Sequence, residues 1–441
     1  VVLLPLRVPL VLVQVAGVDG PLGRSAAVRV GYYHALEGVV AERQVRFGDR
    51  LAAAPAHGAL TSAATERSGG SAATHGALTG AATAKPEGEK PARQQVEVCF
   101  VLDTTGSMGG LIAGAKEKIW SIANDLTDAE PSPDLEIALV GYRDRGDEYI
   151  TKKFALTDDL DAVYENLMKF QANGGGDGPE AVNQALHEAV NEIGWSDDKE
   201  TLKLIFLVGD YPPHMDYEND VKYPQTCKTA LKKDIIINTV QCGTHAATTP
   251  IWKEIARASE GSFVAIEQSG GMAAIETPVD GRIAELTRAI NETVISFGTV
   301  AEQQAVEAKL AAADAAPESA SAARSLYFSK KFAGKAISGG GDLVADYAEG
   351  KVELSKVKEA ALPEEYRKLS EEELDKVVKE KLTERQKLQE EMGKLVAERE
   401  KHVKEVLAKR RSEKRDFGFD AEIRRTVKDQ GAKKGIDYKT E

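Results

Sequence analysis

The sequence predicts an α/β domain built on a doubly wound, mostly parallel sheet, and three observations lead to this prediction. Two short, continuous apolar runs, residues 96–102 and 202–208, are typical of strands that are buried on both faces. Between residues 96 and 298, apolar runs alternate with helical patterns, as expected when helices connect parallel strands. Such connections are right-handed, which places helices on both faces of the sheet.

The elements expected in this Rossmann-like domain follow one another along the chain. A strand at residues 96–102 leads through a helix at 111–126 to a strand at 134–144. The other strands are expected at residues 149–156, 202–208, 235–242 and 261–266. The other helices are expected at residues 159–170, 181–193, 226–233, 250–259 and 282–297.

Polar side chains follow the two apolar runs. The first run is followed by Asp103, Thr105 and Ser107, a carboxylate and two hydroxyls on alternate residues of a sharp turn, and the second is followed by Asp210. A glycine-rich acidic loop with Asp177 lies between the two runs in the sequence. Open α/β sheets bind ligands at the carboxyl ends of their strands. Because oxygen ligands favour Mg²⁺, Ca²⁺ or Mn²⁺ over zinc, we expect a site for a hard divalent cation.

These residues resemble the metal-ion-dependent adhesion site of the von Willebrand factor A (VWA) family, written Asp-x-Ser/Thr-x-Ser, then a distant Thr or Asp, then a further Asp. Asp103, Thr105 and Ser107 match the first element and Asp210 the last, whereas Asp177 stands where the usual Thr is expected. The resemblance implies that Thr105 and Ser107 bind the metal directly. It implies that Asp103 and Asp210 hold its waters and that Asp177 completes the shell.

The family also implies a function. A VWA domain is a binding module for adhesion or scaffolding, not an enzyme, and its metal captures a carboxylate of a protein partner. A directly bound Asp177 would partly neutralise the ion, which should tighten metal binding and weaken attraction for an acidic ligand. If Asp177 lies outside the shell, Asn173, Glu180 or a water must take its place.

The same turn has an alternative interpretation as an enzyme site. Residues 103–107 are similar to the Asp-Lys-Thr-Gly-Thr turn of the P-type ATPases, which implies a Mg²⁺-dependent phosphotransferase or phosphatase with Asp103 as the nucleophile. Against this, Thr104 replaces the lysine, and Asp210 is followed by Tyr-Pro-Pro instead of Gly-x-Asn-Asp. No transmembrane span is expected in the chain. We therefore favour the binding module.

The resemblance covers residues 96–298 and leaves both ends of the chain unexplained. Residues 1–95 are apolar and then low in complexity, and we expect a linker there. The apolar run at residues 1–18 is compatible with a truncated signal peptide, which would place the protein in the periplasm or at the cell surface; otherwise it is cytoplasmic. Three cysteines, Cys99, Cys227 and Cys242, leave the compartment open, because the last two either pair or are separately buried.

The carboxyl-terminal part is expected to be helical. Residues 299–362 are expected to form a linker with short helices, and residues 363–441 a charged helical region, in a layout that resembles bacterial VWA proteins with a helical extension. Ser370 and Glu373 are spaced as a capping box. The patchy heptad that follows fits a helix packed on its own chain or a coiled coil in a homodimer. Because the predicted sheet is complete without this tail, residues 96–298 are expected to fold alone.

Charge narrows the choice of partner. The formal net charge of −13 leaves no basic excess to neutralise phosphates, so nucleic acid is not expected as the main partner.

Overall fold

The computed structural model of this 441-residue chain describes residues 94–176, 178–413 and 418–439, together with the backbones of three strands near the amino terminus. These strands, β1 (Leu10–Gly17), β2 (Ala26–Tyr33) and β3 (Ala41–Gln44), form an antiparallel sheet of their own. They belong to a unit, Val1–Pro86, that is separate from the unit Glu87–Glu441. No strand was predicted here from the sequence, and the low-complexity stretch 52–90 lies outside the described residues.

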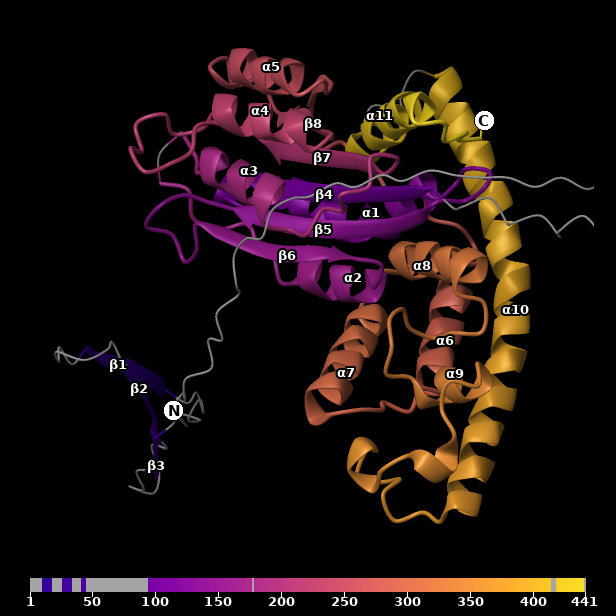
Figure 1. The fold of residues 1–441 in the computed structure, drawn as a ribbon. Coiled ribbons are helices and arrows are strands. Elements are labelled where there is room, and N and C mark those ends of the chain that lie inside the picture. Colours follow the sequence, from indigo (N-terminus) through magenta and orange to yellow (C-terminus); the bar gives the residue numbers. More distant parts are fainter. Residues whose placement is uncertain are drawn as a thin grey trace, which may run out of the picture. The chain divides into compact units, whose positions relative to one another are not determined.

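The second unit is built on a six-stranded sheet with the order β6-β5-β4-β7-β8-β9 (Figure 1). Five strands are parallel: β4 (Gln95–Asp103), β5 (Asp134–Tyr142), β7 (Leu202–Gly209), β8 (Ile235–Cys242) and β9 (Phe263–Ile266). The edge strand β6 (Thr151–Thr157) runs antiparallel to β5. The predicted mostly parallel sheet is therefore confirmed. Leu102 on β4 pairs with Val208 on β7, which brings the ends of the two predicted apolar runs together.

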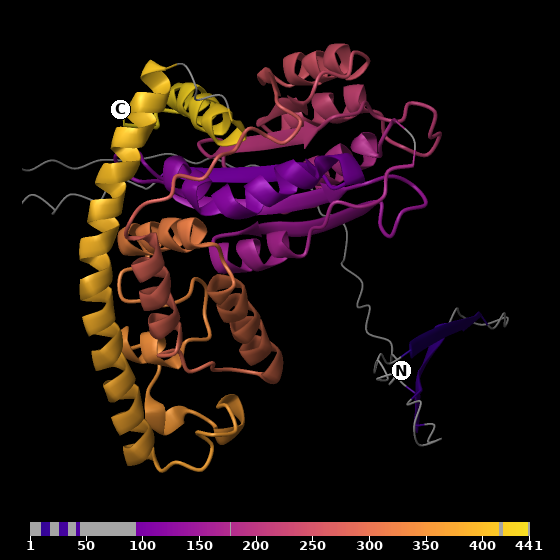
Figure 2. The ribbon, with the colours of Figure 1, turned by 180° about the vertical axis from the view of Figure 1, so that it is seen from behind.

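Helices cover both faces of this sheet, as predicted for a doubly wound domain. One face is covered by α3 (Val182–Asn191), α4 (Tyr223–Lys232) and α5 (Thr248–Ala258), whose apolar residues pack on β4, β5, β7 and β8. The other face carries α1 (Gly109–Leu126) and α2 (Leu160–Met168), and it is turned toward the viewer in Figure 2. All three cysteines are buried and unpaired, so Cys227 and Cys242 form no disulfide.

The α1 face is completed by two helices from much later in the chain. α8 (Glu318–Lys331) packs along α1, where the rings of Tyr327 and Phe328 lie 5.8 and 6.1 Å from that of Trp120. α11 (Phe419–Lys433) also packs beside α1, and the ring of Phe419 lies 6.2 Å from that of Phe100 on β4. The core of the sheet domain therefore includes side chains from outside residues 96–298.

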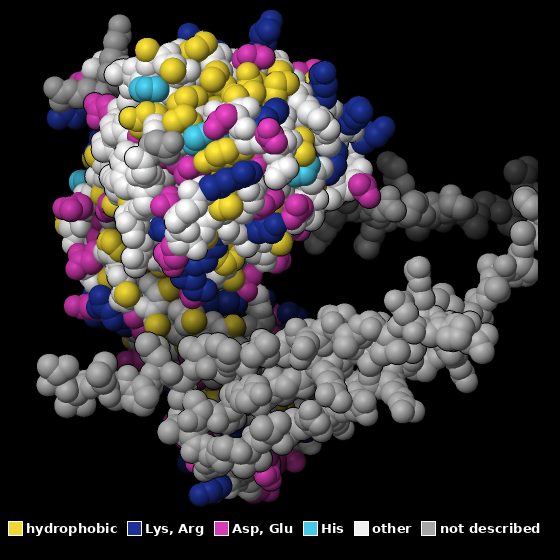
Figure 3. All heavy atoms as spheres, turned by 90° about the vertical axis from the view of Figure 1, so that its left-hand side faces the viewer, with side chains coloured by type: hydrophobic (Ala, Val, Ile, Leu, Met, Phe, Trp, Pro, Cys, Tyr) yellow, Lys and Arg dark blue, Asp and Glu magenta, His cyan; other side chains and the backbone are white. Residues whose placement is uncertain are grey.

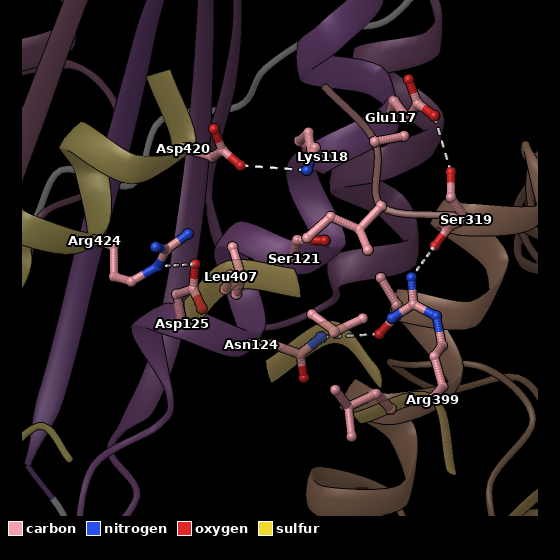
Figure 4. Close-up of a pocket in the computed structure, with 15 residues that line it drawn as sticks. Glu117, Lys118, Ser121, Asn124, Asp125, Ser319, Arg399, Leu407, Asp420 and Arg424 are labelled. Carbon is pink, nitrogen blue, oxygen red and sulfur yellow. Dashed lines mark hydrogen bonds and ion pairs between the residues drawn. The ribbon is translucent and has the colours of Figure 1, made fainter. Parts of the chain in front are cut away.

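Polar contacts fix α11 in this position. Figure 4 shows where it meets α1: Lys118 lies 3.3 Å from the carboxylate of Asp420, and Arg424 lies 2.9 Å from that of Asp125. Asn238 on β8 and Gln430 exchange two buried hydrogen bonds of 3.0 and 2.7 Å. Residues 96–298 were expected to be complete without the tail because they contain every strand of the sheet. That expectation did not include α11, which covers part of one face of the sheet.

The remaining helices form a second layer beside α8. They are α6 (Asp280–Asn291), α7 (Val300–Asp314), α9 (Leu343–Ala348) and the long α10 (Glu371–Ser412), with short 3₁₀ turns at Leu354–Lys356 and Glu359–Ala361. Residues 299–362, expected as a linker with short helices, thus contain α7 and α8, of 15 and 14 residues. No helix in the described part of the chain is long and apolar enough to cross a membrane.

Helix α10 begins at the predicted capping box, where Ser370 and Glu373 exchange hydrogen bonds. Its apolar residues pack on α6, α8 and α9 of the same chain, which is the first of the two arrangements left open by the sequence. The arginines that interrupt its heptad are buried: Arg385 pairs with Asp342 at 2.6 Å, and Arg399 with Asp280 at 2.9 Å. A homodimer through α10 would therefore need a face other than this one.

Candidate metal site

The first predicted ligands lie in one turn at the end of β4. Asp103 is fully buried, and its Oδ1 accepts hydrogen bonds from the backbone N–H of Thr105 at 2.8 Å and from the Thr105 hydroxyl at 2.7 Å. The hydroxyl oxygens of Thr105 and Ser107 lie 3.3 Å apart. Ser107 belongs to a 3₁₀ turn, Gly106–Met108, that leads directly into α1. The turn therefore brings one carboxylate and two hydroxyls together.

Asp210 joins this group from the end of β7. Its side chain is buried, and its Oδ2 accepts a hydrogen bond of 2.8 Å from Gln268. The other oxygens of the pair, Oδ2 of Asp103 and Oδ1 of Asp210, are buried and have no hydrogen-bond partner among the described residues. A buried carboxylate oxygen without a partner is costly, and a cation between the two would remove that cost. The residues present therefore fit a divalent cation.

A third acidic side chain, that of Glu180, lies beside the turn. It is 2% exposed, and its Oε2 also lacks a hydrogen-bond partner among the described residues. Gly175 separates it from Thr105: a Cβ atom on Gly175 would lie 3.0 Å from Cβ of Thr105 and 3.2 Å from Oε1 of Glu180. The sequence offered Glu180 only as a substitute for Asp177. It gave no signal for Gln268, which follows the last strand of the sheet.

Asp177, the fifth predicted ligand, lies outside the described residues, so its place in the site stays a prediction. In the described part of the chain, no three His, Cys, Asp or Glu side chains converge closely enough to hold a metal ion. A cation beside Asp103 and Asp210 would therefore take further ligands from hydroxyls and water.

Burial and mutual repulsion shift the protonation of these acids. Burial raises the pKa of Asp103 to about 7; the hydrogen bonds from Thr105 oppose this shift and the charge of Asp210 adds to it. Burial also raises the pKa of Glu180 to about 9, with added repulsion from neighbouring carboxylates, of which Asp103 is the largest contributor.

Metal affinity is therefore expected to depend on pH. Below about pH 7, a proton on Asp103 competes with the cation, and binding must release that proton. The affinity for Mg²⁺ should rise as the pH increases from about 6 to 8 and then level off as far as Asp103 is concerned. Calorimetry in buffers of different ionisation enthalpy would measure both the affinity and the released protons. An affinity that is constant over this range would contradict the expectation.

Charged and aromatic side chains lie in the segments that follow β5, β7 and β8. The guanidinium of Arg145 lies 3.9 Å from the centre of the Tyr217 ring, and the ring of Tyr211 lies 4.5 Å from that of His245. Figure 3 views the molecule from the side to which the carboxyl ends of the parallel strands point. Acidic and basic side chains are interspersed in the visible part of this face, and hydrophobic side chains gather in its upper part. Such a mixed surface is compatible with a protein partner.

Together, these observations define a doubly wound α/β domain with hydroxyls and carboxylates gathered at the carboxyl edge of its sheet, where they form a candidate cation site. Residues 97–268 match the family model described as von Willebrand factor A domain. This segment of the chain is a VWA domain, and the recognition made from the sequence is confirmed.

Individual proteins are also similar to parts of this chain. A protein of Acanthamoeba polyphaga mimivirus described as an ariadne-like RING finger protein is 26% identical over 155 residues, which cover 34% of this chain and 15% of that protein. The chain thus spans only a small part of this curated relative. Among solved structures, proximal thread matrix protein 1 from the mussel byssus, with a zinc-occupied MIDAS motif, is 19% identical. That alignment covers 40% of this chain and 42% of the other, with a TM-score of 0.32.

The VWA domain of SpRpn10 is a further similar structure. It is 14% identical, with 40% of this chain and 89% of the other covered and a TM-score of 0.31.

Proposed function

We propose that the VWA domain of this chain is a metal-dependent protein-binding module that captures an acidic side chain of its partner. The proposal rests on two buried carboxylate oxygens, one from Asp103 and one from Asp210, that have no hydrogen-bond partner within the described residues. The hydroxyls of Thr105 and Ser107 lie in the same turn as Asp103. Oxygen donors of this kind suit Mg²⁺, with Ca²⁺ and Mn²⁺ as alternatives.

The proposed role of each ligand, direct or through water, follows from its charge. Thr105 and Ser107 bind the ion directly as neutral ligands, and Asp103 and Asp210 hold its waters. Because direct neutral ligands leave most of the positive charge in place, the ion can attract a carboxylate from outside. The partner's side chain would then replace one of the waters and complete the shell.

A capture experiment tests this proposal against a purely structural role for the metal. The immobilised protein would be incubated with extract of the source organism in Mg²⁺ and in EDTA, and the thermal melting of both forms would be recorded. We expect partners that are retained only in Mg²⁺ and are lost from the Asp103→Asn variant. If the metal raises the melting temperature but does not change which partners are captured, its role is only to stabilise the fold, and the proposal is overturned.

The alternative, a phosphotransferase, leads to an opposite expectation. We expect neither ATP hydrolysis nor a phosphorylated Asp103. The residue in the place of the P-type lysine, Thr104, is buried; its hydroxyl donates to the carbonyl of Tyr142 at 2.8 Å and lies 2.8 Å from the Tyr149 hydroxyl. The turn thus lacks the cation that would help to neutralise a phosphoryl group. Incubation with γ-labelled ATP would check this, and hydroxylamine-sensitive label that disappears in Asp103→Asn would contradict it.

A further inference from the structure

The backbone holds Glu180 firmly next to the proposed cation. Its N–H donates to the carbonyl of Pro212 at 3.0 Å, and its carbonyl accepts from the N–H of His214 at 3.0 Å. These two bonds form an isolated β-bridge between Glu180 and Pro213, in the segment that follows Asp210. The residue is thus tied to the same loop that carries a proposed ligand, immediately before α3 begins at Val182.

The side chain of Glu180 points toward the Asp103–Ser107 turn. Oε1 of Glu180 and the side chain of Thr105 both lie close to the position that a Cβ atom of residue 175 would occupy. Gly175 has a φ of +77°, a conformation that disfavours a side chain, and any Cβ there would press against both groups. The glycine therefore allows the carboxylate to approach the threonine that is proposed to bind the ion.

Glu180 has no cationic partner among the described side chains. No Lys, Arg or His forms an ion pair with Glu180 among the described residues, and Oε2 has no hydrogen-bond partner there. The charges that act on Glu180 most strongly are all negative: Asp103, Asp144, Asp210 and Asp147. A buried carboxylate in such surroundings requires a cation or a proton.

We infer that Glu180 is an additional member of the cation site and that its carboxylate holds a metal-bound water on the Thr105 side. The inference rests on the proposed function, because it assumes a divalent ion beside Asp103 and Asp210. Contact through water is chosen because no three acidic side chains converge closely enough to bind one ion directly in the described part of the chain. An outer carboxylate of this kind orients a bound water and adds to the attraction for the ion.

The inference also assigns a consequence for ion binding. A third carboxylate near the ion raises the affinity for divalent cations, since affinity in oxygen-ligand sites depends on the number of charged ligands. It lowers the net positive field that reaches a partner. Glu180 is thus a residue that sets the balance between holding the ion and capturing an acidic ligand.

The test compares Glu180→Gln and Glu180→Asp with a matched control on α3, the helix that follows Glu180. Glu188→Gln is the control, because Glu188 is also buried but lies 3.4 Å from Lys153 and so has a partner. Mn²⁺ affinity would be measured by calorimetry, and the number of waters on bound Tb³⁺ by its luminescence lifetimes in H₂O and D₂O. Melting of the metal-free proteins would show that each variant is folded.

We expect Glu180→Gln to weaken Mn²⁺ binding about 10- to 100-fold, the usual effect of losing an outer-shell partner, with the number of Tb³⁺-bound waters unchanged. Glu180→Asp keeps the negative charge but moves it further from the ion, so a smaller loss of affinity is expected. Glu188→Gln should bind Mn²⁺ as tightly as the unaltered protein. Unchanged affinity in both Glu180 variants would overturn the inference. A gain of one bound water in Glu180→Gln would show a direct ligand and would overturn the water-mediated placement.

The same experiment separates this inference from the proposed function. If Asp103→Asn abolishes Mn²⁺ binding while the Glu180 variants bind normally, the cation site stands and the role of Glu180 is wrong. If Asp103→Asn also binds normally, the site itself is wrong.

Discussion

A chain that ends at residue 413 is expected to lose the stable fold of its VWA domain, although every strand of the sheet is retained. The truncation removes five apolar side chains that are at most 7% exposed: Phe419, Ile423, Val427, Ile436 and Tyr438. At about 1.5–3 kcal/mol for each buried side chain, their loss is comparable with the whole stability of a domain, about 5–15 kcal/mol. Thermal melting and light scattering would show unfolding or aggregation.

Two controls make this prediction specific. Removal of residues 1–86, which form a unit of their own, should leave the melting of the VWA domain unchanged. Within α11, Phe419→Ala should cost about 3–5 kcal/mol, whereas Arg425→Ala, at a side chain that is 63% exposed, should change stability by less than about 0.5 kcal/mol. A truncated chain that melts like the full protein would mean that the VWA domain does not need α11 for its stability.

Replacement of Asp103 is expected to abolish binding of Mg²⁺ and Mn²⁺ without unfolding the protein. Asp103→Asn keeps the shape of the side chain and an oxygen that can accept from Thr105, but it removes the charge that faces Asp210. One unit charge at contact distance is worth on the order of 1–4 kcal/mol near a protein surface. Calorimetry with each ion would measure the loss. Because the replaced charge is buried, the metal-free variant should melt no lower than the original protein.

The matched control for this variant is Asp197→Asn. Asp197 is exposed and precedes β7, so it lies at the opposite edge of the sheet from the proposed site. The Asp197→Asn variant should bind Mg²⁺ and Mn²⁺ with unchanged affinity. Retention of full affinity in Asp103→Asn would remove Asp103 from the site.

Local patterns were sufficient to predict the sheet and the two strands that carry Asp103 and Asp210. Continuous apolar runs identify strands buried on both faces, and parallel pairing brings their carboxyl ends to one edge whatever the intervening sequence does. The packing of α11 on the face of the sheet that carries α1 could not be predicted in this way. Residues 419–433 look like a charged helix, and nothing local in them indicates that Gln430 will meet Asn238 inside the core.

The same limit applies to other long-range features. Along the sequence of α10, Arg385 and Arg399 only interrupt the apolar heptad. Their partners are distant in sequence, because Asp342 is the N-cap residue of α9 and Asp280 begins α6. Glu180 ranked below Asp177 because the family pattern, which fixes spacing along the chain, does not show which buried carboxylate lacks a partner.

The late position of α11 has a consequence for the newly made protein. The hydroxyl of Tyr438 donates to the carbonyl of Leu126, and 312 residues separate the two. At synthesis rates of about 5–20 residues per second, the ribosome needs roughly 15–60 s to travel that distance. During this interval one face of the nascent sheet has no cover from α11. The apolar side chains that α11 covers therefore stay open to solvent until that helix has been made, and such transiently exposed surface favours aggregation.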